Sequence, residues 1–144
     1  MLKKATAADL PAVAALACRL WPDNTIADML DDLALFPESE DAAIFLIHEG
    51  SAAVGFAQCS LRHDYVEGTQ SSPVGYLEGI YVDEAHRRLG YARLLLSACE
   101  IWAREQGCTE FASDCELHNT QSLQFHLKTG FEEANRIICF TKPL

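Results

Sequence analysis

The stretch GYLEGIYVDEAHRRLGYA, residues 75–92, decides the fold. Its first half, with the preceding Val74, is rich in apolar, β-branched and aromatic residues, which favour a buried strand up to Val82. Its second half begins an apolar pattern at helical spacing, so the strand is predicted to lead into a helix. Glu78 interrupts the strand with a carboxylate. Because burying an unpaired carboxylate is costly, we expect Glu78 to line an open cleft and to have a functional role.

The turn Arg87-Arg88-Leu89-Gly90-Tyr91-Ala92, between the strand and the helix, has the composition of an anion site. Gly90 and the small Ala92 allow the backbone to approach a ligand closely. The first N–H groups of a helix have no partner within the helix, and with the helix dipole they favour a negative charge such as a pyrophosphate. The spacing excludes the GxxxxGK and GxGxxG phosphate loops. An ordinary solvated helix start is the alternative interpretation.

The other segments predict a mixed α/β sheet with helices on both faces, folded as one domain over residues 1–144. Thr6 precedes Asp9, and Thr25 precedes Asp28, at the spacing of helix capping boxes. Strands are expected at residues 2–6, 42–63 (two strands around a hairpin turn at 49–51), 74–82, 108–115 and 131–142, the last as one bent strand or two; helices are expected at 6–21, 25–36, 90–107 and 119–130.

Composition excludes several classes of protein. The net charge of -10 argues against a nucleic-acid partner, because phosphates attract clustered Lys and Arg. No apolar run approaches the ~20 residues that cross a bilayer, so no membrane association is expected. The N-terminus lacks the apolar core of a signal peptide, which suggests a cytoplasmic protein. The six cysteines form no CxxC pair, so we expect reduced, buried thiols and no metal site.

Two motifs resemble those of the GCN5-related N-acetyltransferase (GNAT) superfamily. The first is R-x-x-G-x-A, from Arg87 to Ala92. The second is Asn119-x-x-Ser122-x-x-x-His126-x-x-x-Gly130-Phe131, which is similar to the superfamily's N-x-x-[AS]-x-x-x-Y-x-x-x-G-F helix. Both lie in the expected order, and the predicted element order covers essentially the whole chain. The resemblance implies the GNAT fold and acetyl-CoA as the acetyl donor.

The resemblance also implies where acetyl-CoA binds. The backbone of Ile80, Tyr81 and Val82 would hydrogen-bond the pantetheine arm. The backbone from Arg88 to Ala92 would hold the pyrophosphate, and Asn119 would contact the molecule from the other side.

His126 is a departure from the superfamily, which usually has a tyrosine that protonates the departing thiolate. A histidine, with an ordinary pKa of ~6.5, could donate that proton in its cationic form. Packing beside the acetyl donor is the alternative role for His126. Tyr81 and Tyr91 are the other candidates for the acid.

Carboxylates are expected where an amine reacts. Attack on a thioester requires a neutral amine, whereas aliphatic amines are mostly protonated at neutral pH. Carboxylates attract the ammonium, and one of them can take its proton directly or through water. Glu78 and Asp114 are the candidates, if the strands that carry them separate at this point. For Asp114, a solvated acid near a helix is the alternative.

A longer resemblance points to one branch of the superfamily, the aminoglycoside 6'-N-acetyltransferases. It rests on LRHDYVEGTQSSPVGYLEGIYVDEAHRRLGYA, CTEFASDCELHN and RLWPD. It implies that Trp21 and Tyr65 form flat walls for sugar rings, while Glu78 and Asp114 hold amines. By itself, Trp21 is more often a core residue. Members of this branch tend to form dimers through C-terminal strands, so a homodimer is expected.

The resemblance weakens after Gly130, where Asn135 and Arg136 stand in place of an expected acidic group. Two alternatives to the aminoglycoside function stay open. One is acetylation of polyamines or another small endogenous amine, which would need a similar acidic site. The other is a non-catalytic module that binds acyl-CoA.

Overall fold

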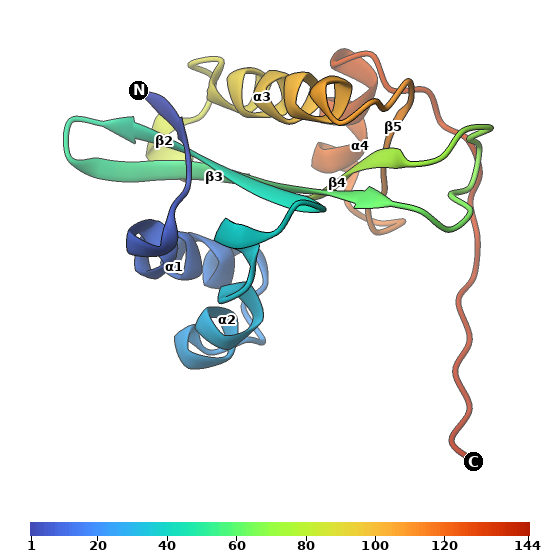
Figure 1. The fold of residues 1–144 in the computed structure, drawn as a ribbon, viewed down its shortest axis with the longest axis horizontal. Coiled ribbons are helices and arrows are strands. Elements are labelled where there is room, and N and C mark those ends of the chain that lie inside the picture. The colour runs from blue at the N-terminus through green and yellow to red at the C-terminus, as the bar shows by residue number, and fades with distance from the viewer.

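A five-stranded mixed sheet lies between two layers of helices in the computed structural model, which describes residues 1–144 (Figure 1). The strands are β1 (Leu2–Lys4), β2 (Ala42–Glu49), β3 (Ala52–Arg62), β4 (Val74–Val82) and β5 (Phe111–Ser113), in that spatial order. Neighbouring strands are antiparallel except β4 and β5, which are parallel. Helices α1 (Leu10–Leu20) and α2 (Ile26–Leu33) cover one face, and α3 (Tyr91–Glu105) and α4 (Thr120–Lys128) cover the other. The predicted α/β class is confirmed.

The predicted cap at Thr25 begins α2, whereas the predicted cap at Thr6 begins a 3-10 helix at Ala7–Asp9 and α1 itself begins only at Leu10. The backbone N–H of Thr6 donates to the Asp9 carboxylate at 2.8 Å, in a capping box that opens a short 3-10 helix leading into α1. Pro11 is near the start of α1, where its missing N–H removes no helical hydrogen bond. Thr25 accepts the backbone N–H of Asp28 at 3.1 Å at the start of α2.

Several elements are shorter than predicted, most clearly α2, β5 and β1. The helix α2 ends at Leu33, and a separate 3-10 helix follows at Phe36–Glu38, because Pro37 cannot donate a backbone hydrogen bond to continue α2. The strand β5 contains only Phe111–Ser113 of the predicted 108–115. The strand β1 ends at Lys4.

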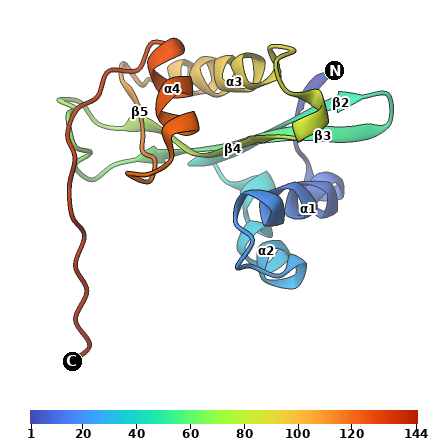
Figure 2. The ribbon, with the colours of Figure 1, turned by 180° about the vertical axis from the view of Figure 1, so that it is seen from behind.

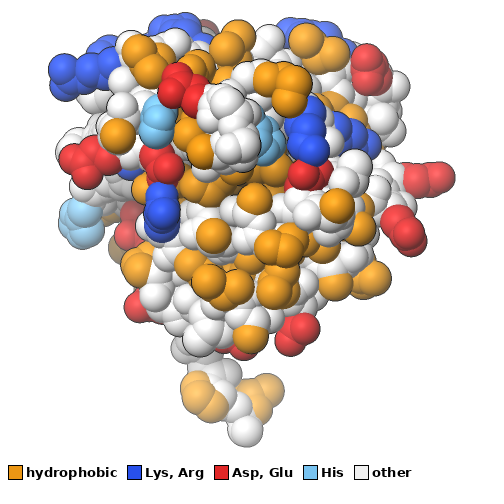
Figure 3. Space-filling view, turned by 90° about the vertical axis from the view of Figure 1, so that its left-hand side faces the viewer, with side chains coloured by type: hydrophobic (Ala, Val, Ile, Leu, Met, Phe, Trp, Pro, Cys, Tyr) orange, Lys and Arg blue, Asp and Glu red, His pale blue; other side chains and the backbone are white.

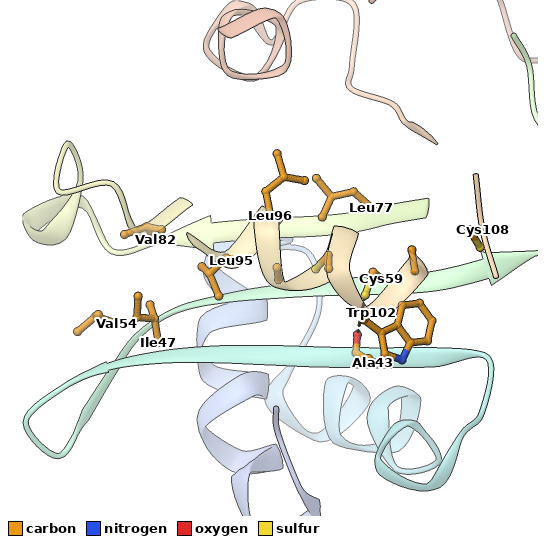
Figure 4. Packing of buried hydrophobic residues seen from close by; sticks show 13 residues of the cluster. Ala43, Ile47, Val54, Cys59, Leu77, Val82, Leu95, Leu96, Trp102 and Cys108 are labelled. Atoms are coloured by element: carbon orange, nitrogen blue, oxygen red, sulfur yellow. Dashed lines mark hydrogen bonds between the residues drawn. The ribbon is translucent and has the colours of Figure 1, made fainter. Parts of the chain in front are cut away.

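Each helix layer packs its own apolar cluster against the sheet. Leu95, Cys99 and Trp102 of α3 pack against β2, β3 and β4 (Figure 4). On the opposite face, Val13 of α1 and Phe56 of β3 belong to a second cluster with α2. Fully burying one side chain of this size contributes about 1.5–3 kcal/mol, so these two clusters hold the helix layers on the sheet.

The cysteines divide into two groups. Those in the core are Cys59, Cys99 and Cys108, while Cys18 is half-buried and Cys115 and Cys139 are exposed. The prediction of buried thiols is therefore wrong for Cys115 and Cys139, which lie after the last well-packed strand. A hydrogen bond with Cys59 and burial raise the pKa of the Cys99 thiol, which keeps it protonated and unreactive.

Over the stretch where β3 and β4 pair, β4 contributes one residue more than β3. Gly79 pairs with Gln58 and Leu77 pairs with Cys59, so Glu78 has no partner on β3. Such a β-bulge re-aims the side chains that follow it. Leu77 and Val82 consequently lie in the same apolar cluster beneath α3, although an unbroken strand would turn them to opposite faces.

The parallel pairing of β4 with β5 stops at this bulge. Only Gly75, Tyr76 and Leu77 pair with β5, opposite Phe111 to Ser113. From residue 78 onward, that side of β4 has no neighbouring strand, and its backbone N–H and C=O groups have no ladder partner there. The predicted separation of the two strands is therefore present, and we call it the β4/β5 fork.

The C-terminal segment contradicts the prediction. Residues 131–144 form no strand, and the last of them run away from the body in an extended path (Figures 1 and 2). The apolar residues of this segment suggested strands, but a strand needs a neighbour to pair with, and this chain places none beside it. Ile137, Ile138 and Phe140 are 68%, 80% and 87% exposed. No helix of the structure combines the length and apolar character needed to cross a membrane.

Candidate active site

Glu78 forms an ion pair with Arg62, the last residue of β3. Arg62 donates from Nε to Glu78 Oε1 at 3.2 Å, and from Nη2 to both carboxylate oxygens, with 2.9 Å to Oε2. The Glu78 side chain is 20% exposed and that of Arg62 is 45% exposed. The carboxylate in the middle of the strand is therefore paired and still in contact with solvent.

Tyr76 connects this ion pair to Asp114. The Arg62 guanidinium carbon lies 3.5 Å from the centroid of the Tyr76 ring, which is cation–π geometry. The Tyr76 hydroxyl donates to the Asp114 carboxylate. Burial and this hydrogen bond raise the pKa of Tyr76, so the hydroxyl stays a donor at neutral pH. Glu78, Arg62, Tyr76 and Asp114 thus form one connected group, which we call the acidic cluster.

Trp21 lies against β4 beside the bulge. A Cβ atom on Gly79 would come within 2.6 Å of the Trp21 ring, so only glycine allows this close approach. The Trp21 ring also packs edge-on against Phe56, with the ring centroids 6.2 Å apart. The structure therefore places Trp21 against Gly79, the neighbour of Glu78. Part of the Trp21 side chain is buried, as expected for a core residue.

Tyr65 lies in the loop between β3 and β4 and is 76% exposed. The next residue, Val66, packs with Val74 and Tyr76, so the loop is anchored beside the acidic cluster. No hydrogen bond joins the Tyr65 hydroxyl to another predicted site residue.

His126 of α4 forms hydrogen bonds through both ring nitrogens. Its Nδ1 lies 2.7 Å from the carbonyl oxygen of Ser122, and its Nε2 lies 2.8 Å from Ser113 Oγ. Because a carbonyl only accepts, Nδ1 carries a hydrogen. The neutral ring then accepts from the Ser113 hydroxyl, and the cationic ring donates to it. Ser113 is the last residue of β5 and directly precedes Asp114, so His126 is positioned at the β4/β5 fork.

The two other candidates for the acid have different surroundings. Tyr91 donates its hydroxyl to Glu49 in the β2–β3 hairpin, and this hydrogen bond raises the pKa of Tyr91. The Tyr81 ring lies beside Arg87, whose guanidinium carbon is 5.6 Å from the ring centroid. Of the three candidates, His126 is the one that hydrogen-bonds β5.

The turn before α3 has the backbone conformation of an anion site. Arg88 and Gly90 have φ angles of 65° and 83°, in the left-handed region, and a Cβ on Gly90 would meet nothing within 4 Å. Arg88 is exposed and has no hydrogen-bond or ion-pair partner within the chain. Arg87 instead turns back, and its Nε donates to the Val82 carbonyl at 2.9 Å. Arg88 is thus the arginine available to a bound anion.

The surface at the end of the molecule that carries the β2–β3 hairpin has charges of both signs. Seen from the end that carries the β2–β3 hairpin, acidic, basic and histidine side chains lie close to one another (Figure 3). The anion site is therefore a local feature of the backbone and one arginine, not part of a broad basic surface.

Asn119 caps α4 and keeps part of its side chain free. Its Oδ1 accepts the Ser122 backbone N–H at 3.0 Å, and its amide hydrogens have no partner within the chain. On β4, the backbone of Ile80 to Val82 lies beyond the last pair with β5. The predicted contacts to the acetyl donor thus lie on β4, at the start of α3 and at the start of α4.

The C-terminal segment contacts the same loop as Tyr65. The Asn135 side-chain amide donates to Glu67 at 2.9 Å, and Arg136 pairs with Glu133. An acidic residue expected in this region is thus replaced by an amide that attaches the segment to the β3–β4 loop.

Arg62 and Tyr76 are the site residues that the sequence interpretation missed. Tyr76 and Glu78 are two residues apart in one strand, a spacing that places side chains on one face and could have linked them. Arg62 lies in the segment that carries the longer resemblance, but nothing in its spacing shows that it reaches Glu78.

This chain is similar in sequence and fold to known proteins over nearly its full length. It is 43% identical over 144 residues to the aminoglycoside N(6')-acetyltransferase type 1 of Stenotrophomonas maltophilia, covering 99% of this chain and 93% of that protein. It is 38% identical to the protein of the same name from Acinetobacter haemolyticus, covering 99% and 98%. The structure of AAC(6')-Iy in complex with the bisubstrate analogue CoA-S-monomethyl-acetylneamine matches with a TM-score of 0.95 and 36% identity, covering 100% of this chain and 98% of that one.

The forked mixed sheet, with helices on both faces, defines the class of acyl-CoA N-acyltransferases. Residues 10–131 match the Acetyltransferase (GNAT) family, and the chain belongs to that family. The family predicted from the two motifs is confirmed.

Proposed function

We propose that this chain is an aminoglycoside 6'-N-acetyltransferase that transfers acetyl from acetyl-CoA to the 6'-amino group of the antibiotic and so confers resistance. The observation that carries the proposal is the acidic cluster beside the β4/β5 fork, where two carboxylates lie within one group of connected side chains. Relatives of about the same length that bear this activity in their names support it. The acetamide product has one positive charge fewer, which weakens its binding to an anionic target.

Acetyl-CoA fits the residues that the motifs indicate. The unpaired edge of β4 at Ile80 to Val82 offers backbone groups to an amide-containing arm, and the left-handed turn at Arg88 and Gly90 offers N–H groups to phosphates. The free amide hydrogens of Asn119 add a donor. We assign these residues to binding of the acetyl donor. We expect the reaction to need no metal.

The reaction assigns distinct roles to the acidic cluster and to His126. The amine nitrogen attacks the thioester carbonyl carbon within a ternary complex, the C–S bond breaks, and the sulfur leaves as a thiolate that takes up a proton. Glu78 and Asp114 bind the ammonium groups, and Glu78 takes the amine proton directly or through water. His126, in its cationic form, supplies the proton to the thiolate. Trp21 and Tyr65 contact the sugar rings.

A panel of aminoglycosides tests this proposal. CoA release is measured with compounds that carry a 6'-amine and with matched compounds that carry a 6'-hydroxyl. Activity restricted to the 6'-amines supports the proposed regiochemistry. A kcat/KM for spermidine well above that for tobramycin would assign the enzyme to polyamines, and CoA release that no amine stimulates would leave only acyl-CoA binding.

We further propose that the enzyme is one domain, acts in the cytoplasm and forms a homodimer. The exposed apolar residues of the C-terminal segment support the dimer, because such side chains are normally covered by a partner. Cysteines without disulfides support a reducing compartment.

A further inference from the structure

Arg62 connects Glu78 to the rest of the acidic cluster. It contacts Glu78 through three hydrogen bonds and Tyr76 through its ring, and Tyr76 in turn contacts Asp114. Arg62 and Tyr76 are both needed to connect the two carboxylates, but Arg62 is the member of the group that contacts Glu78 itself.

Glu78 depends on such contacts for its orientation. At the bulge it has no pairing residue on β3, and it lies beyond the last pair with β5. Its backbone is therefore less constrained than that of its neighbours, and the direction of its carboxylate is set by the side chains around it.

Arg62 remains charged in this environment. Burial lowers the pKa of Arg62, but the hydrogen bonds and negative charge of Glu78 outweigh this effect and leave that pKa raised. A planar guanidinium that binds both oxygens of a carboxylate fixes its plane as well as its position, which an ammonium cannot do.

We infer that Arg62 is a positioning residue, which orients the Glu78 carboxylate and sets its spacing from Asp114 for substrates that carry two amines. The inference rests on the proposed aminoglycoside function. An ionised carboxylate has about four acceptor sites, and Arg62 donates three hydrogen bonds to Glu78. One site is thus left for an amine of the substrate, which can bind without displacing the guanidinium.

A double-mutant cycle between Arg62 and Glu78 tests the inference. Kinetics with tobramycin are measured for Arg62→Met, Glu78→Gln and the double variant. We expect Arg62→Met to raise KM about tenfold with a smaller change in kcat, because an amine-binding carboxylate loses its orientation. In the Glu78→Gln background, Arg62→Met should alter kcat/KM by only about twofold, because the carboxylate that Arg62 orients is no longer there.

Arg104→Met is the matched control. It removes the same charge and an exposed salt bridge, to Glu100 on α3, outside the acidic cluster. Its kinetic constants should stay near those of the wild type, which separates the effect of position from that of net charge.

Two further variants keep the test informative if Arg62→Met folds poorly. Arg62→Lys retains the positive charge but not the planar guanidinium that binds both carboxylate oxygens. It should therefore recover less than half of the affinity that Arg62→Met loses. Tyr76→Phe retains the ring but not the hydrogen bond to Asp114 and should raise KM about threefold.

Opposite outcomes overturn the inference. A KM that falls in Arg62→Met would mean that the guanidinium occupies the place of the substrate amine. Losses that simply add in the double variant would mean that Arg62 does not act through Glu78. Both results presuppose wild-type activity on tobramycin; a wild type that is inactive on every aminoglycoside contradicts the proposed function itself.

Discussion

Glu78 illustrates how one strand accommodates an expensive side chain. The bulge frees it from the ladder, the end of β5 leaves it beside an open edge, and Arg62 neutralises its charge. Each of these features lowers the desolvation cost of a carboxylate in an apolar strand. The residue can therefore serve binding without destabilising the sheet.

Replacing Glu78 with Gln should lower kcat/KM for aminoglycosides by about 10²-fold, because the amide keeps the shape of the side chain but neither attracts an ammonium nor accepts a proton from it. Steady-state kinetics of CoA release measure the loss. Binding of CoA, measured by calorimetry, should be unchanged. Activity close to that of the wild type would remove Glu78 from the mechanism.

Replacing His126 with Ala should lower kcat by about 10²-fold while KM for the aminoglycoside changes little, because the acid acts on the leaving thiolate and not on the amine. The thermal midpoint must be recorded alongside, since the variant also loses hydrogen bonds to Ser113 and Ser122. A lower thermal midpoint with kcat preserved would indicate a packing role only.

The start of α1 shows how a few side chains fix an element. Asp9 accepts hydrogen bonds from Thr6 and lies 2.7 Å from the Lys3 ammonium of β1, so it connects the first strand to the first helix. The hydrogen bond and charge of Lys3, with the backbone N–H of Thr6, lower the pKa of Asp9 to about 2.

Replacing Asp9 with Ala should lower the free energy of unfolding by about 1 kcal/mol at neutral pH, the typical effect of losing a cap. A depressed carboxyl pKa stabilises the folded state above the unfolded-state pKa, and this contribution is lost as the pH falls through the folded-state pKa. The difference between the variant and the wild type should therefore shrink between about pH 4 and pH 2.

Urea denaturation at several pH values measures this change. Asp31→Ala, on the exposed side of α2, is the matched control and should show little effect, because no hydrogen bond of its side chain is present. A difference for Asp9→Ala that stays constant down to pH 2 would contradict the assignment.

Local sequence signals predicted most elements of the fold. Capping residues located α1 and α2, the Glu49–Ser51 turn located the hairpin, and apolar spacing located α3 and β4. These signals act within a few residues. The C-terminal strands were mispredicted because a strand depends on a neighbour, and residues 131–144 have none in this chain.

The candidate site was also predictable only where its signals are local in the sequence. A carboxylate in an apolar strand indicated Glu78, and the family motifs indicated the turn from Arg88 to Ala92. The contact between Arg62 and Glu78 depends on a bulge, and an unpaired residue in a strand leaves no mark in the hydrophobic pattern. Its partner could therefore not be found from spacing alone.

At the scale of the whole molecule, the C-terminal segment is the feature that one chain does not explain. Its apolar side chains project into solvent, while the core on both faces of the sheet is already closed by helices. An extended segment with unpaired backbone groups can add as a strand to a second copy, which would cover these side chains.

Replacing Ile138 with Asp should therefore shift the enzyme from dimer to monomer, because a carboxylate would be buried in the interface. Light scattering coupled to size-exclusion chromatography, over a range of concentrations, measures the mass. Ile101→Asp, on the exposed side of α3, is the control and should remain dimeric. A wild type that is monomeric at every concentration would contradict the proposal.

The extra residue in β4 also decides which face of the sheet the side chains beyond it meet. Side chains alternate along a strand, so the face that each one meets depends on whether an odd or an even number of residues separates it from a fixed point. Leu77 and Val82 share the layer of α3, and Tyr81 packs toward α1, only because Glu78 stands outside the pairing. Pairing residue 78 into the ladder would exchange the environments of everything beyond it, whereas deleting it would join Leu77 directly to Gly79 and keep the alternation beyond it unchanged. The burial of Leu77 and Val82 beneath α3 therefore depends on residue 78 remaining unpaired, and not on its presence.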